Sequence, residues 1–108
     1  MNRVRLDLNS PVFQETWFAL ESSDGLRVLA ALRKLNKLTW DQLYRDPGLR
    51  WEAIAWRTAS DGERLYSFRV TQKVRAVAFR DGGLLRLQGV HAEFRISIVP
   101  PINNLEIS

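Results

Sequence analysis

The sequence predicts a small α+β protein in which helices cover one face of a mainly antiparallel sheet. Between residues 10 and 46, apolar side chains recur at the spacing of helices. From residue 49 to residue 91, they alternate with polar ones, which is the period of strands. Turn sequences separate the alternating runs. Together these observations predict the order β-α-α-β-β-β-β.

The first half of the chain is predicted to hold one strand followed by helices. Residues 4–8 (VRLDL) alternate as a short strand does. Ser10 and Pro11 form a typical N-cap and first-turn pair, and Asp24 is placed to cap a second helix. The sequence TWDQ, beginning at Thr39, fits a capping box that opens a further short helix.

The second half is predicted to form four strands joined by turns. The expected strands are residues 49–56, 65–71, 74–80 and 84–91, with turns at 60–64, 72–73 and 81–83. Alternation places Arg75 on the same face as Val77, and His91 on the same face as Leu85 and Leu87. The tryptophans are expected to pack in the core rather than stack on bases; they are Trp17, Trp40, Trp51 and Trp56.

The composition indicates one globular, basic domain. The 108 residues are 45% hydrophobic and 26% charged, which suits a single modest core. Of the 16 cationic residues, only Lys34, Lys37 and Lys73 are lysines, and arginine pairs with phosphate in two places. Residues 57–95 carry eight Lys and Arg against four Asp and Glu, which equals the net charge of +4. This surplus fits an anionic partner or a solvated, arginine-rich surface.

Several kinds of site have no support in the sequence. Cysteine is absent and histidine occurs once, so a thiolate or histidine-rich metal site is not expected, and a reducing cytoplasm is compatible. No apolar run approaches the ~20 residues that span a bilayer, and the N-terminus does not resemble a signal peptide. The remaining chemistry is a metal-free acid/base set of Glu52, His91 and arginines. A lone histidine at a strand end is more often structural or merely exposed than catalytic.

A composite pattern in residues 65–91 resembles a known family. It consists of an aromatic residue, an arginine in a strand, a threonine turn, an arginine before two small or branched residues, a DG hairpin and a strand ending in histidine. In this chain these are Tyr66, Arg69, Val70-Thr71, Arg75-Ala76-Val77, Asp81-Gly82 and His91. The pattern resembles the C-terminal half of the RelE/ParE toxin superfamily, especially its YoeB- and HigB-like ribonuclease branches.

Upstream segments extend this resemblance. DLNSPVF, LRKLNKLTWDQLYRD and GLRWEAI resemble a subgroup of small bacterial proteins described as toxin components, so the likeness covers about residues 3–91. It implies a RelE-like toxin domain in residues 1–91. Residues 92–108 are then a C-terminal extension whose pattern fits an added edge strand, a partner-binding arm or a disordered tail.

The resemblance implies the toxin of a type II toxin–antitoxin system, a cytoplasmic, metal-independent endoribonuclease that cuts mRNA on the ribosome and inhibits translation. It makes Glu52 the general base, Arg75 the phosphate-stabilising residue and His91 the general acid. It also implies an acidic antitoxin, the ribosome and mRNA as partners, and no cofactor. RNA-backbone binding is expected from Arg57, Arg64, Arg69, Lys73, Arg80 and Arg86.

Two alternatives share the same fold. One is a non-catalytic, ParE-like toxin that binds gyrase, and the other is a degenerate relative that binds only RNA or an antitoxin. The joint presence of Glu52, Arg75 and His91 favours the nuclease. Ala92 and Glu93 depart from the family pattern, because ribonuclease members often have an aromatic or hydroxylated residue close after the histidine.

Overall fold

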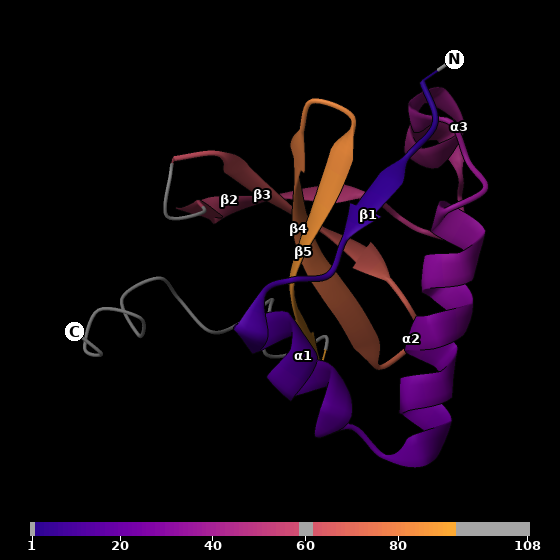
Figure 1. The fold of residues 1–108 in the computed structure, drawn as a ribbon, viewed down its shortest axis with the longest axis vertical. Coiled ribbons are helices and arrows are strands. Elements are labelled where there is room, and N and C mark those ends of the chain that lie inside the picture. Colours follow the sequence, from indigo (N-terminus) through magenta and orange to yellow (C-terminus); the bar gives the residue numbers. More distant parts are fainter. Residues whose placement is uncertain (1, 59–61, 93–108) are drawn as a thin grey trace.

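The computed structural model describes residues 2–58 and 62–92, with the backbone alone for residues 55–58, and it confirms the α+β prediction. Three helices lie along one flank of a five-stranded sheet, an arrangement compatible with a small RelE-like fold (Figure 1). In chain order the elements are β1 (Arg5–Asp7), α1 (Pro11–Phe18), α2 (Ser22–Leu35), α3 (Trp40–Arg45), β2 (Glu52–Thr58), β3 (Arg64–Arg69), β4 (Val74–Asp81) and β5 (Leu84–Ala92). Apart from Ala92, the predicted extension 92–108 lies outside the described residues.

Two of the three predicted helix starts are confirmed. The hydroxyl of Ser10 accepts a hydrogen bond from the backbone N–H of Phe13 at 3.2 Å and caps α1. Thr39 and Gln42 form the predicted capping box of α3. The third was wrong, because α2 begins at Ser22 and Asp24 lies inside its first turn, where the helix dipole favours a carboxylate. In the described part of the chain, no helix is long and apolar enough to cross a membrane.

The sheet places the first strand, β1, beside the last strand, β5. Its strand order is β1-β5-β4-β3-β2, with β1 parallel to β5 and the remaining pairs antiparallel. Arg5 is the partner of Leu84 and Asp7 is the partner of Arg86, so the first strand completes the edge beside the last one. The local hairpins β2–β3–β4–β5 therefore form the body of the sheet.

The main core lies between the helices and one face of the sheet. Phe13 of α1, Leu35 of α2 and Trp40 of α3 are at most 2% exposed, and they belong to one cluster with Phe68 and Leu85 of the strands. Burial of each such side chain stabilises the fold by roughly 1.5–3 kcal/mol. The predicted core role is confirmed for Trp40. Trp17 and Trp51 pack against the cluster but remain partly exposed. The side chain of Trp56 lies outside the described residues.

A smaller cluster lies on the opposite face of the sheet. Its members are all strand residues: Ile54, Leu65, Val77 and Phe79. Arg75 lies two residues before Val77 in β4, and residues two apart in a strand point to the same face. Arg75 therefore also points to this face, as predicted. The face without helices is therefore partly apolar and carries the charged residues that the sequence singled out.

A β-bulge changes the face that His91 occupies. The register between β4 and β5 shifts just after Val77, which leaves Gln88 as an extra residue in β5. Leu87 stays in the core beneath the helices, whereas Gly89 and His91 turn to the opposite face with Val77. The prediction that His91 shares a face with the leucines was wrong, because strict alternation does not hold across a bulge.

The segment before β2 is a folded loop rather than the start of a strand. Asp46 accepts hydrogen bonds from the backbone N–H groups of Gly48 and Leu49, and Lys34 of α2 binds the same carboxylate at 2.9 Å. Arg50 then adopts a positive φ of 47°. The strand predicted from residue 49 therefore begins only at Glu52.

Replacing Asp46 by asparagine is expected to lower the free energy of unfolding by about 1 kcal/mol at pH 7, since asparagine keeps an acceptor for the backbone but loses the charge that Lys34 binds. The hydrogen bond from Lys34 lowers the pKa of Asp46 in the folded protein. This stabilisation is complete above the unfolded pKa of about 3.9 and is lost as the pH falls through the lower folded value. Denaturant unfolding at several pH values should show the difference between the two proteins shrinking in acid.

The matched control is Asp41→Asn, which removes the exposed ion pair between Asp41 and Arg45 on α3. Its effect should stay within about 0.5 kcal/mol at each pH, because exposed pairs contribute little. A difference between wild type and Asp46→Asn that does not change with pH would contradict the assigned role of the carboxylate.

Candidate active site

The three residues proposed for catalysis lie on the same face of the sheet, opposite the helices. Arg69 of β3, Arg75 of β4 and His91 of β5 are direct partners across three neighbouring strands. Glu52 of β2 is the partner of Ser67 in the adjoining row. Partners in an antiparallel sheet share a face, so these side chains lie on one face although up to 39 positions separate them in the sequence, with β3 and β4 between Glu52 and His91.

Glu52 and Arg75 form the central contact of the site. Oε1 of Glu52 lies 3.7 Å from Nη2 of Arg75. The Glu52 side chain is 56% exposed, whereas that of Arg75 is only 4% exposed. A carboxylate therefore stands at the surface directly above a buried positive charge.

The Arg75 guanidinium binds the protein around it. Its Nε donates to Oγ of Ser67 at 3.0 Å, and its Nη2 donates to the carbonyl oxygens of Arg50 at 2.6 Å and Ser67 at 3.1 Å. Ser67 is also buried, with 3% exposure. These contacts satisfy a buried charge, which would otherwise be strongly destabilising.

The imidazole of His91 lies against the bare backbone of Gly89. A Cβ placed on Gly89 would be 2.6 Å from Nε2 of His91. The ring therefore leans back along β5 toward the row that contains Glu52, because Gly89 is the partner of Val77 and belongs to that row. The absence of a side chain at residue 89 allows this position.

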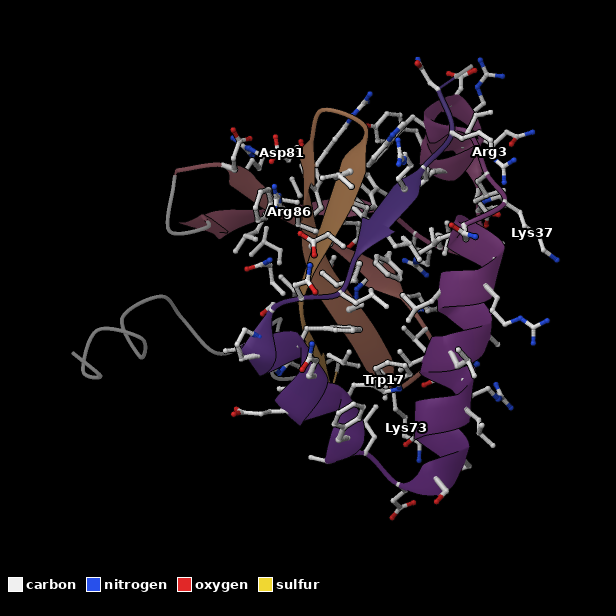
Figure 2. The ribbon with its side chains drawn as sticks, in the orientation of Figure 1. Arg3, Trp17, Lys37, Lys73, Asp81 and Arg86 are labelled. Atoms are coloured by element: carbon white, nitrogen blue, oxygen red, sulfur yellow. The ribbon has the colours of Figure 1, made fainter. Side chains whose placement is uncertain are left out.

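The residues predicted to bind RNA do not form one surface. The guanidinium of Arg80 stacks at 4.2 Å over Trp40 and donates to the hydroxyl of Tyr44, so it lies on the helix side. Arg86 binds Asp7 at 2.6 Å and Asp81 at 2.8 Å, and its pKa is raised, mainly by Asp81. Figure 2 shows the paired side chains of Arg86 and Asp81 at the end of the sheet far from the β3–β4 turn.

The remaining predicted RNA-binding residues are also separated. Arg64 is exposed at the start of β3, and the side chain of Arg57 lies outside the described residues. Arg69 belongs to the row of the site, as described above, while Lys73 lies in the turn before β4 and is labelled at the lower end of the sheet in Figure 2. Arg69 and Lys73 line a surface hollow.

That hollow is a basic groove between α2 and the end of β3. One part, of about 300 Å³, is lined by Arg27, Lys73, the acidic Asp24 and uncharged polar residues, and a part that shares Arg27, of about 230 Å³, is also lined by Lys34 and Arg69. Small and apolar side chains form much of its lining. We call it the α2 groove; Arg69 belongs both to it and to the row of the site.

Sequence reasoning missed several residues of this region. Arg27 and Lys34 were not assigned to a binding surface, although their seven-residue spacing puts them on one side of α2. Ser67 and Gly89 carried no motif beyond their places in strands. Arg50 gave no signal, because a positive φ at an arginine cannot be inferred from its neighbours.

The arrangement can support acid/base chemistry on an anion. It offers one exposed carboxylate, one imidazole and two guanidinium groups within two adjoining rows of the sheet. Within the described ranges, no three His, Cys, Asp or Glu side chains come together as metal ligands would.

Comparison with known proteins adds little to these observations. No protein-family model matches the chain, and no curated protein matches it. The crystal structure of a copper-bound mutant toxin from Helicobacter pylori is similar to it, with a TM-score of 0.47 and 17% sequence identity over 88% of this chain and 98% of that chain. Similarity at this level shows no shared activity or ligand, so the function of this chain has to be inferred from its own residues.

Replacing Gly89 by alanine is expected to displace the His91 imidazole, because the added carbon would lie 2.6 Å from its Nε2. The ring can turn away, so the free energy of unfolding should change by less than about 1 kcal/mol. In NMR spectra, the contacts between the ring protons of His91 and the Hα protons of residue 89 should be lost without being replaced by contacts with the alanine methyl group. The matched control is Gly83→Ala, where a Cβ meets nothing within 4 Å. Unchanged ring contacts in Gly89→Ala would refute this position of His91.

Proposed function

We propose that the protein is a cytoplasmic bacterial toxin of a type II toxin–antitoxin system that cleaves mRNA on the ribosome and so inhibits translation. The observation that carries this proposal is the placement of Glu52, Arg75 and His91 on one face of the sheet, with Glu52 beside Arg75 and Arg75 paired with His91. The family pattern identified these residues from separate segments of the sequence. Placement on one face of the sheet is a condition for acting on the same phosphodiester.

The proposed reaction is an internal transesterification of RNA. Glu52 takes the proton from a ribose 2′-hydroxyl, and the resulting oxygen attacks the adjacent phosphorus. The bond from phosphorus to the 5′-oxygen breaks, and His91 gives a proton to that oxygen as it leaves. The products are a 2′,3′-cyclic phosphate and a 5′-hydroxyl, so that atoms and charge balance without water or a metal ion as reactant.

Positive charge for this step comes from the pair Arg69 and Arg75. They are partners across the sheet, so two guanidinium groups lie side by side on this face. Positive groups that are already fixed beside the phosphorus stabilise the negative charge that develops in the transition state, which is a major source of catalysis. The pair therefore supports a phosphodiester as the ligand of this face.

The α2 groove supports the proposal of an acidic antitoxin as partner. Arg27, Lys34 and Lys73 supply cations along its sides, while its apolar lining suits aliphatic side chains of a peptide. It shares Arg69 with the row of the site. An acidic segment bound there would compete with RNA for that arginine.

The test is cleavage of mRNA by the purified protein on ribosomes. Glu52→Gln and His91→Gln should each lower the cleavage rate by about 10²–10⁴-fold, the usual contribution of a general base or acid. The matched control is Glu15→Gln, an exposed glutamate of α1 on the helix side, which should leave the rate unchanged. Mapping of mRNA 5′ ends by primer extension measures the cuts.

Other outcomes separate the alternatives. Full activity in both variants would refute the assigned roles of Glu52 and His91. Growth arrest on expression without any cut mRNA, together with trapped gyrase–DNA complexes, would replace the nuclease by the non-catalytic ParE-like function. Unimpaired growth on expression would indicate a relative that only binds RNA or an antitoxin.

A further inference from the structure

Arg75 is the most deeply buried charged side chain of the site, at 4% exposure. It donates to three oxygen atoms of the protein, two on Ser67 and the carbonyl of Arg50. If the guanidinium moved out to meet a phosphate, these oxygens would lose their donors. Leaving buried polar groups unsatisfied costs more than a typical hydrogen bond contributes, so Arg75 is held inside.

The hydrogen bond from Arg75 to the carbonyl of Arg50 holds the backbone at that residue. In the described ranges Arg50 is the only residue other than glycine with a positive φ, at 47°. Such a conformation is unfavourable for an arginine and persists only when surrounding contacts enforce it. The carbonyl of Leu49 accepts from the backbone N–H of Arg69 at 2.6 Å, and the next carbonyl, that of Arg50, accepts from Arg75 at 2.6 Å.

Two successive carbonyls are therefore fixed immediately before Trp51 and Glu52. The strand β2 begins at Glu52, so the conformation at Arg50 sets where this strand starts and where the carboxylate stands. The ion pair between Glu52 and Arg75, at 3.7 Å, adds a direct contact to the same unit.

We propose that Arg75 is a positioning residue that clamps the left-handed turn at Arg50 and thereby places Glu52, and that Arg69 is the arginine that contacts the substrate phosphate. Arg69 faces Arg75 across the sheet, is partly exposed and lines the α2 groove. The clamp concerns the folded chain alone. The assignment of Arg69 rests on the proposed function, so the two parts need separate readouts.

The clamp is tested by a double-mutant cycle between Arg75→Lys and Arg50→Gly. Glycine adopts a positive φ without strain, so Arg50→Gly should raise the folding equilibrium constant of the wild type by about fivefold. Lysine keeps the charge of Arg75 but lacks the planar fork, so the turn is no longer enforced. In that background the gain from Arg50→Gly should disappear.

Amide hydrogen exchange provides a second readout of the clamp, and it needs no substrate. Arg75→Lys should accelerate exchange of the Arg69 N–H, which is bonded to the carbonyl of Leu49. The matched control is Arg33→Lys, an exposed arginine of α2 that should alter neither readout. Equal gains from Arg50→Gly in both backgrounds, or unchanged exchange in Arg75→Lys, would overturn the clamp.

The contact with phosphate is tested by sulfur substitution at the cleaved phosphodiester. Replacing one non-bridging oxygen by sulfur should slow cleavage by the wild type by about tenfold if an arginine binds that oxygen. The ratio of oxygen to sulfur rates should fall to near one in Arg69→Lys and stay at the wild-type value in Arg75→Lys. The reverse pattern would overturn the assignment of Arg69. Absence of cleavage by the wild type would instead refute the proposed function. The clamp would still be tested by the double-mutant cycle and by hydrogen exchange.

Discussion

The open face of the sheet is organised around one buried guanidinium. Arg75 of β4 binds Ser67 of β3 and the carbonyl of Arg50 before β2, so three segments meet at a single side chain. A charge in this position is tolerated only because its donors are satisfied, and removing one partner would leave the others buried without compensation. The left-handed turn at Arg50 and the start of β2 at Glu52 follow from it.

The same constraint links stability to the proposed chemistry. Glu52 is exposed, yet it stands over the buried Arg75, and His91 reaches the neighbouring row because a bulge and Gly89 let its ring lean back over the strand. Rigid strands therefore hold the carboxylate and the imidazole, rather than mobile loops. Groups that exchange protons with a bound substrate need such fixed geometry, because small displacements lower the rate steeply.

Much of the fold could be predicted from the sequence, because the determinants are local. The cap at Ser10, the capping box at Thr39 and the alternation around Arg75 each act within a few residues. The missed features are tertiary. The bulge at Gln88 and the turn at Arg50 depend on partners far along the chain, and strict alternation therefore put His91 on the wrong face. The family pattern named Glu52, Arg75 and His91, but only the strand register shows that they share one face in adjoining rows.

The central claim is that this face of the sheet performs a transesterification that starts from a ribose 2′-hydroxyl. The most direct measurement is ribosome-dependent cleavage of an mRNA that carries a single 2′-deoxynucleotide at the mapped cut position, on the 5′ side of the cleaved bond. The account predicts that cleavage at this position disappears while other positions are still cut, because the attacking oxygen is missing. Undiminished cleavage at the 2′-deoxynucleotide would contradict it.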